Sequence, residues 1–395
     1  MIDMRTVIRL EEIAEIGRGS SPRPIGDKKY FKDGTIPWVK IADATASGKY
    51  IYETKEHVND YGASFSRILE SGSLIMSSSG VSLGIPKFLG IKGCIHDGWL
   101  YFSNIHDIDK EYLYYVLKTM RPYFDNLSYG AAIQNINSDI LKKTKLEVPD
   151  IKIQKEISLF LSKYDALIEN NNKRIKILEQ MAEELYKEWF VKMRFPGFGK
   201  MNFKREMPKG WVLGEHNVME IPESWKFGRV GEIGSFARGK NITKDEMVEG
   251  RIPVISAGIG PSGYHNESNV RGYSLTMSAS GANAGYLNYH LNDIWAADCS
   301  YYHNDSNIWF MYNSLNFIRK AIDNLQVGSA QPHVYPKNIN KLCILLPEEK
   351  YILKFNEYVK PFYENIKVLR SKNENLVKQR DLLLPRLMSG KLEVK

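Results

Sequence analysis

Two stretches of the chain carry the most regular pattern of apolar and polar residues. Within residues 151–190, and again 198 residues further along, apolar side chains recur at alternating spacings of four and three residues. This spacing is typical of a long helix that buries one face in a seam. The first seam consists of Ile157, Leu161, Tyr164, Ile168, Asn171, Ile175, Leu178, Ala182, Leu185 and Trp189. The second consists of Phe355, Val359, Phe362, Ile366, Leu369, Asn373, Leu376, Arg380, Leu383 and Leu387. We therefore predict two long helices, over residues 150–193 and 348–395.

Polar residues interrupt both seams, at Asn171 in the first and at Asn373 and Arg380 in the second. A buried Asn in a seam fixes the register of two helices at some cost in stability. The alternative is that the seam opens at these positions, and the pattern favours neither. Because an apolar seam has to be buried against another surface, each helix is the natural partner of the other. The globular segment between them favours an antiparallel pair with the globular domains at opposite ends.

Two prolines, Pro361 and Pro385, fall inside the second predicted helix. Proline removes a backbone hydrogen bond and clashes with the preceding turn. We therefore expect a kink or a restart of the helix near residue 361 and a distorted last turn near residue 385. Gly390 is suited to cap the end of this helix.

The remaining sequence alternates short β-like runs, such as IPWVKI and KLCILLP, with helical runs such as EYLYYVLKTMRPYF. These runs fill residues 1–149 and 223–347, whereas residues 194–222 are rich in Gly, Pro, Lys and Met and are interpreted as a linker. The predicted fold class is α+β. It comprises two similar α/β domains, separated by two long antiparallel helices that resemble a coiled coil.

An internal repeat with pseudo-two-fold symmetry supports this organisation. The matching segments are residues 12–20 with 230–240, Met-Ser-Ser-Ser-Gly at 76–80 with Met-Ser-Ala-Ser-Gly at 277–281, and residues 129–149 with 327–347. The last pair shares the helices' offset of 198 residues, which carries Gly130 onto Gly328 and Pro149 onto Pro347. The chain therefore consists of two copies of one unit, each a domain followed by a helix.

Composition narrows the class of protein only slightly. Lysine and arginine total 54 against 46 aspartates and glutamates, a net charge of +8, which is compatible with a polyanionic partner although many basic proteins bind none. The widely spaced Cys94, Cys299 and Cys343 form neither a disulfide framework nor a zinc motif. The sequence shows no secretion signal and no apolar stretch near the roughly 20 residues that span a bilayer. We expect a cytoplasmic protein with no membrane partner.

Catalytic motifs occur only as fragments. Residues 195–199, FPGFG, match a loose methyltransferase cofactor-loop pattern, but a helical run precedes them where that loop needs a strand. Residues 234–241, GSFARGKN, nearly match a phosphate-binding loop, but Asn241 replaces the required Ser or Thr. The sequence has no Pro-Pro pair, as adenine methyltransferases need, and no zinc-protease, serine-hydrolase or kinase motif. Four histidines near acidic residues lack metal-ligand spacing and are interpreted as loop histidines: His96, His106, His290 and His303. We expect no catalytic centre and no metal site.

Both domains carry features suited to contact with nucleic acid. Polar, glycine-containing loops at 77–84 and 278–285 let backbone amides approach phosphates, basic residues surround these loops, and amide or aromatic side chains that can read base edges fill a matched later segment. The candidates in the first domain are Arg18, Arg23, Lys28, Lys29, Ser78, Ser79, Gly80, Lys87, Gln134, Asn135 and Asn137. Those in the second are Arg238, Lys240, Ser278, Ser280, Gly281, Gln331, His333 and Tyr335. For each of them a solvated surface position is the alternative.

The order of domain, long helix, domain and long helix resembles the specificity subunit of Type I restriction-modification enzymes over essentially the whole chain. The second domain opens with Ile-Pro-Glu-Ser-Trp at 221–225 and the chain closes with LLLPRLMSGKLEV, both similar to that family. The Ser-x-Ser-Gly loops and Gly-Ser-Ala-Gln at 328–331 also fit. The displaced glutamine of residues 130–134 and the proline at 361 depart from the pattern.

This resemblance implies that each globular domain reads one half of a split, asymmetric site in double-stranded DNA. It implies that the helices are a spacer and a docking surface for two modification subunits, which use S-adenosylmethionine. Two restriction-translocation subunits, which use ATP and Mg²⁺, then join, and this chain itself binds no cofactor. Two alternatives are weighed against this. A stand-alone DNA methyltransferase lacks support because its motifs are missing, and a coiled-coil scaffold accounts for the helices but not for two similar domains with such loops.

Overall fold

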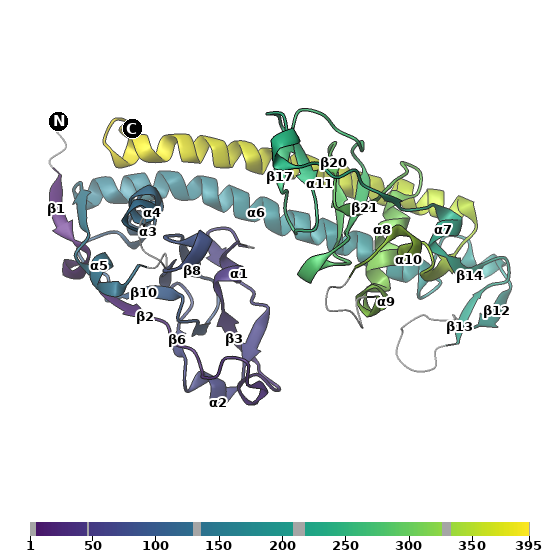
Figure 1. Ribbon diagram of the computed structural model, residues 1–395, viewed down its shortest axis with the longest axis horizontal. Helices are drawn as coiled ribbons and strands as arrows, with labels where there is room; N and C mark the ends of the chain where they lie inside the picture. The colour runs from purple at the N-terminus through teal and green to yellow at the C-terminus, as the bar shows by residue number, and fades with distance from the viewer. Residues whose placement is uncertain (1–4, 46, 129–135, 208–217, 326–332, 395) are drawn as a thin grey trace. The chain divides into compact units, whose positions relative to one another are not determined.

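The computed structural model describes residues 5–45, 47–128, 136–207, 218–325 and 333–394. The chain divides into two compact units, which we call unit 1 (Met1–Asn171 with Lys372–Lys395) and unit 2 (Asn172–Ser371). The division passes through both long helices, α6 (Ile151–Phe190) and α11 (Glu349–Met388). Each unit therefore contains one globular domain and one half of each helix (Figure 1).

The globular domain of unit 1 contains two sheets and a separate strand pair. The larger sheet has the order β2 (Glu15–Arg18), β10 (Trp99–Ser103), β7 (Leu74–Ser77), β8 (Pro86–Leu89), β4 (Tyr50–Ile51). The smaller has the order β5 (Glu56–Val58), β3 (Ile36–Val39), β9 (Gly93–Ile95), β6 (Arg67–Leu69), and β1 (Thr6–Arg9) pairs with β11 (Lys145–Val148). The helices and 3-10 turns are η1 (Leu10–Glu12), η2 (Lys28–Tyr30), α1 (Ile41–Thr45), α2 (Asp60–Ala63), η3 (Gly80–Ser82), α3 (Lys110–Thr119), α4 (Arg121–Ser128) and α5 (Ser138–Lys142).

The central strand β7 shows why this domain is layered. Its residues alternate between two apolar clusters, because successive side chains of a strand point to opposite faces. Leu74 and Met76 pack with α3 residues such as Leu113. Ile75 packs with Trp99 on the side of the smaller sheet. The strand is consequently buried on both faces, and the sheet lies between helices and a second sheet.

The globular domain of unit 2 repeats this plan. Its larger sheet has the order β15 (Ala237–Arg238), β21 (Cys299–His303), β18 (Ser274–Ser278), β19 (Leu287–His290). Its smaller sheet has the order β17 (Gly263–His265), β16 (Ile252–Ile255), β20 (Trp295–Ala296), and β14 (Lys226–Arg229) pairs with β22 (Cys343–Leu346). The helices and turns are α7 (Val230–Ile233), η5 (Lys244–Glu246), η6 (Gly281–Asn283), α8 (Ile308–Phe317), α9 (Arg319–Asn324) and α10 (Pro336–Ile339). The strands β15, β21, β18 and β19 follow the order of β2, β10, β7 and β8, and β17, β16 and β20 follow the order of β5, β3 and β9. The shared order confirms the predicted α+β fold and its internal repeat, while the edge strands β4 and β6 occur in unit 1 without a counterpart in the described part of unit 2.

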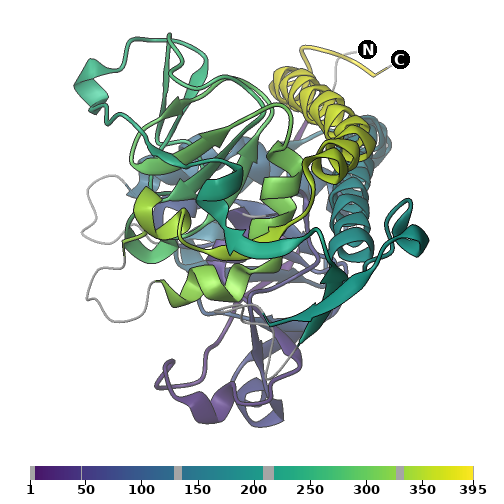
Figure 2. The ribbon, with the colours of Figure 1, turned by 90° about the vertical axis from the view of Figure 1, so that its right-hand side faces the viewer.

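Figure 2 shows the long helices α6 and α11 next to each other, and the contacts within each unit show that they run in opposite directions. In unit 1, Leu161 of the first half of α6 belongs to the same apolar cluster as Leu387 of the last turns of α11. In unit 2, Phe190 at the end of α6 contacts Phe355 near the start of α11, with ring centroids 5.3 Å apart. Every seam position named above is buried or half-buried. The pair is therefore antiparallel.

Asn171 and Asn373, two of the polar residues in the seams, bond to each other across the helix pair. The Nδ2 of Asn171 donates to the Oδ1 of Asn373 over 2.8 Å. Such a pair is satisfied only in one alignment of the helices, which favours the register role over an opened seam. Arg380 forms an ion pair with the buried Asp165 of α6.

The expected restart near Pro361 is wrong, because α11 continues without interruption from Glu349 to Met388. Each proline removes one backbone hydrogen bond, while the flanking Val359 and Tyr363 are fully buried in the core of unit 2 and hold the helix in place. Gly390 follows the helix with φ of +71°, and its N–H donates to the carbonyl of Leu387, as expected for a C-terminal cap.

The segment interpreted as a linker has structure of its own. After the turn η4 (Phe198–Lys200), strand β12 (Phe203–Glu206) pairs antiparallel with β13 (Met219–Pro222). Across the described part of the chain, no helix has the length and apolar character required to span a membrane.

Candidate nucleic-acid interface

In both globular domains, three strands of the larger sheet place loops and a charged strand end at one edge. In unit 1, Arg18 ends β2 opposite Leu100 of β10, and Ser77 ends β7 opposite Trp99. The loop that follows β7 and the turn that precedes β10 therefore lie together. We call Arg18, Arg23, Ser78 and Asp97 the first edge cluster.

Asp97 organises the first edge cluster. The Nε of Arg18 donates to the Asp97 carbonyl over 2.6 Å, and its Nη2 lies 3.5 Å from the Oγ of Ser78. Arg23 forms an ion pair with the Asp97 carboxylate. Both arginines are exposed, so the cluster presents two restrained guanidinium groups and one carboxylate at the surface. The neighbouring His96 has a lowered pKa, chiefly because it is partly buried, although Asp97 opposes the shift.

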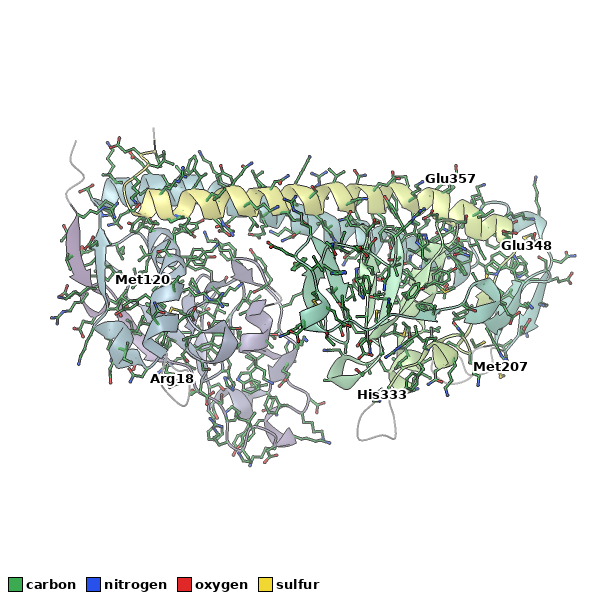
Figure 3. The ribbon with its side chains drawn as sticks, turned by 45° about the horizontal axis from the view of Figure 1, so that its top comes forward. Arg18, Met120, Met207, His333, Glu348 and Glu357 are labelled. Atoms are coloured by element: carbon green, nitrogen blue, oxygen red, sulfur yellow. The ribbon has the colours of Figure 1, made fainter. Side chains whose placement is uncertain are left out.

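Unit 2 forms a corresponding second edge cluster from Arg238, Ser280, Asp298 and Tyr335. Arg238 ends β15 opposite Ser300 and forms an ion pair with the Asp298 carboxylate. The other oxygen of that carboxylate accepts a hydrogen bond from the Oγ of Ser280 over 2.7 Å. The guanidinium carbon of Arg238 lies 6.0 Å from the centroid of the Tyr335 ring. Figure 3 labels Arg18 and His333, which lie at the two edges.

His333 contacts both the glycine loop and Tyr335 of the second edge cluster. It forms an isolated β-bridge with Ser280. Its ring stacks on that of Tyr335, with centroids 5.7 Å apart and an angle of 14° between the planes. An imidazole, a phenol and a guanidinium therefore lie side by side at this edge.

The glycine loops have the same conformation in both domains. Gly80 and Gly281 have φ of +72° and +74°, in the left-handed region that glycine adopts without strain. The loops close in the same way, by bonds from the N–H of Gly84 to Ser77 and from the N–H of Gly285 to Ser278, over 2.9 and 2.8 Å. Both left-handed glycines are exposed, so their backbone is open to approach by a ligand.

Lys87 is a correction to the sequence-based candidates. Its side chain is buried in β8 and donates to the carbonyl oxygens of Ser47, over 2.8 Å, and Gly48. Burial lowers the pKa of Lys87 to about 8. In this position the ammonium group satisfies backbone carbonyls and does not reach a phosphate.

The candidate serines divide by burial. Ser78 and Ser278 are buried, and their hydroxyls donate to the carbonyls of Gly98 and Ala257 over 2.9 and 2.8 Å, so they brace the loops from inside. Ser79 and Ser280 are half-buried at the loop surface.

The other described candidates lie at the surface. Lys28, Lys29 and Lys240 are exposed, Lys29 lies 3.0 Å from the carboxylate of Asp27, and Lys240 lies 5.9 Å from the centroid of the Trp295 ring. Gln134, Asn135 and Gln331 lie outside the described residues.

Two aspartates central to the clusters were not among the candidates. Asp97 lies two residues before the buried strand β10 and Asp298 directly precedes the buried strand β21, and the offset that carries Gly80 onto Gly281 also carries Asp97 onto Asp298. This match between the two repeats could have identified both aspartates from the sequence. The expectation of loop histidines is also wrong for His290 and His303, which end strands β19 and β21.

Metal chemistry has no visible basis in the described ranges, where no group of three or more His, Cys, Asp or Glu side chains could hold an ion. The free thiols of Cys94 and Cys299 are buried and have raised pKa values, which keeps them protonated at neutral pH.

Comparison with known proteins identifies the family of the chain and similar folds. A family model described as the Type I restriction modification DNA specificity domain matches residues 3–180 and 222–379. The chain is 26% identical to the Type I restriction enzyme MjaIX specificity subunit of Methanocaldococcus jannaschii, over 98% of this chain and 93% of that protein. It is 24% identical to the MjaVIII specificity subunit of the same organism, over 94% and 92%. Its fold is similar to the crystal structure of the Type-I restriction-modification system S subunit from M. genitalium, with a TM-score of 0.53, 17% identity and coverage of 98% and 96%.

Proposed function

Because the chain belongs to the Type I restriction-modification DNA specificity family, we propose that it recognises a two-part, asymmetric site in double-stranded DNA and holds the other subunits of the complex on that site. The observation that carries this proposal is the edge cluster, which occurs once in each globular domain. Two clusters that each expose an arginine on a repeated scaffold are suited to two DNA segments. Their neighbouring side chains differ, so the two segments differ in sequence.

The helix pair supports the second half of the proposal. Large apolar side chains are exposed on the helices away from the seam, among them Leu159 and Leu167 of α6 and Leu382 of α11, which are 62%, 54% and 68% exposed. Contiguous exposed apolar side chains mark docking sites for other proteins, and we propose that these leucines contribute to such a site. The partners we propose are two modification subunits and two restriction-translocation subunits.

The chemistry belongs to those partners in this proposal. S-adenosylmethionine is used by the modification subunits, and ATP and Mg²⁺ by the restriction-translocation subunits, whereas this chain binds none of them and has no catalytic role. The sequence supports this division because it lacks the motifs that such cofactors need. The length of the helices, about 60 Å for 40 residues each, would set the gap between the half-sites.

Methylation mapping tests the proposal. Purified modification subunits are incubated with DNA and S-adenosylmethionine, with and without the full chain, and methylated adenines are mapped. We expect methylation only when the chain is present, at a motif of two unlike parts with a fixed gap. The chain alone should transfer no methyl group. Methylation by the chain alone, or the same motif in its absence, would overturn the proposal.

A further inference from the structure

We infer that the groups common to both edge clusters hold the DNA backbone, and that the groups in which the clusters differ read the bases. This inference rests on the proposed function, because it requires that the two domains read different half-sites. A protein group that both domains share cannot distinguish the DNA sequence of one half-site from that of the other. What all half-sites share is the sugar–phosphate backbone, and contacts to it position a protein without specifying sequence.

The arginines occupy equivalent backbone positions. Each is followed by a glycine whose N–H donates to the first residue of the partner strand, Gly19 to Trp99 over 2.8 Å and Gly239 to Cys299 over 2.9 Å. The backbone N–H of the residue after each glycine donates to the carbonyl of the final residue of a strand in the smaller sheet. Ser20 donates to Ile95 of β9, and Lys240 donates to Ala296 of β20. Arg18 and Arg238 are thus presented from the same place on the same scaffold.

Each arginine is also restrained by the matching aspartate, although through different atoms. Arg18 donates to the backbone carbonyl of Asp97, whereas Arg238 pairs with the carboxylate of Asp298. A second exposed cation, Arg23 or Lys240, accompanies each pair, so each edge keeps a surplus of positive charge. A restrained side chain loses less conformational entropy on binding, which favours a fixed contact to a phosphate.

The two domains differ at an equivalent position next to the loops. In each domain a later segment of the chain is anchored on the glycine loop by an equivalent backbone hydrogen bond. The N–H of Ile136 donates to the carbonyl of Ser78 over 2.8 Å, and the N–H of Val334 donates to the carbonyl of Ala279 over 2.9 Å. The next residue is an exposed Asn137 in unit 1 and an exposed Tyr335 in unit 2.

These two residues offer different chemistry to a base. The Oδ1 of Asn137 caps α5 by accepting from the N–H of Ile140 over 2.8 Å, which leaves its amide N–H₂ as the donor. Tyr335 offers a hydroxyl and a ring that stacks on His333. Different donors and acceptors at one position are what two unlike half-sites require.

The experiment separates backbone contact from base reading. Full chains carrying Arg238→Ala, Arg238→Lys, Arg18→Ala or Tyr335→Ala are assembled with modification subunits. Affinity for a pool of random-sequence duplexes is measured over a range of salt concentrations, and the motif is read by methylation mapping. Lys200→Ala, on the turn η4 outside the sheet that carries the edge, is the matched control for loss of one exposed charge.

We expect each arginine-to-alanine variant to bind the random pool about tenfold more weakly and to reduce the slope of log affinity against log salt by about one, with an unchanged motif. Arg238→Lys should keep the wild-type slope, because the slope depends on how many phosphates are neutralised and lysine keeps the charge. Tyr335→Ala should keep the slope and relax one half of the motif.

Two outcomes would overturn the inference. If Arg238→Ala relaxes one half-site while the slope stays unchanged, the arginine reads bases. If it changes neither affinity nor motif, the arginine only supports the fold. Failure of the proposed function is recognised separately, because then the wild-type complex itself yields no two-part motif.

Discussion

Identical charges in the sequence have different roles according to their surroundings. Arg18 and Lys87 are both basic residues of the first domain and were both candidates for DNA contact. Arg18 is exposed at the end of a strand, whereas Lys87 is buried in β8. The sequence made Arg18, Arg238 and the loop glycines candidates because they recur in a repeat, and the structure places them at matching positions of the two domains. It did not predict the burial of Lys87, because burial depends on strands that pair from distant parts of the chain.

His290 gives a prediction at the scale of one residue. Burial, with a smaller effect of Arg370, lowers the pKa of His290 from 6.5 to about 4, and its Nε2 lies 2.7 Å from the Oγ1 of Thr276. Between pH 6.5 and pH 4 the unfolded chain therefore binds a proton that the folded chain does not. The contribution of neutral His290 is fully present above pH 6.5 and is lost as the pH falls toward 4.

The replacement His290→Gln should remove this dependence. Acidification from neutral pH to pH 4 should lower the free energy of unfolding of unit 2 less in the variant than in the wild type, with a difference of roughly 3 kcal/mol. Denaturant unfolding at a series of pH values measures it. His303→Gln, an exposed histidine at the end of β21, is the control and should keep the wild-type dependence. Parallel curves for wild type and His290→Gln would contradict the assignment.

At the scale of elements, heptad spacing was enough to predict both long helices and their seams. It left the polar seam positions open, because spacing alone does not show what a side chain meets. The structure pairs Asn171 with Asn373 and Arg380 with Asp165. Asp165 also accepts from the hydroxyl of Tyr115, which lies on α3. The helix pair and the globular domain of unit 1 are thus joined by a buried polar group that no periodicity indicates.

Arg380→Met tests this junction. The change leaves Asp165 buried without its main cation, although Lys49 remains 3.8 Å away. We expect the free energy of unfolding of unit 1 to fall by about 2–3 kcal/mol at neutral pH. Chemical denaturation followed by the circular dichroism of the helices measures it.

The double variant Asp165→Asn with Arg380→Met should recover part of the loss, because no uncompensated charge then remains buried. Arg386→Met, at an exposed position of the same helix, should change stability little. An equal loss in the single and double variants would show that packing, and not charge, holds the junction.

At the scale of the whole molecule, the repeat was the most informative feature of the sequence. It predicted two domains of one plan, each followed by a long helix. The strand pair of β12 and β13 lay outside that prediction, because these strands fall in a segment with no counterpart in the repeat. Strand order within each sheet was equally beyond the pattern, since it depends on contacts between residues far apart in the chain.

The proposed spacer role of the helices predicts the effect of lengthening them. Seven residues inserted into each helix, next to Asn171 and next to Asn373, add two turns and keep both seams in phase. They lengthen the pair by about 10 Å, and we expect the gap between half-sites to grow by about three base pairs. Methylation mapping reads the gap. An unchanged gap with full activity would show that the helices do not set it.

The central claim is that each globular domain reads its own half of the DNA site. The most direct test replaces residues 1–149 with the corresponding domain of a relative and maps methylated adenines made by the complex with its modification subunits. We predict that one half of the motif changes, while the other half and the gap stay as in the wild type. A motif that changes in both halves, or in neither, would contradict the account.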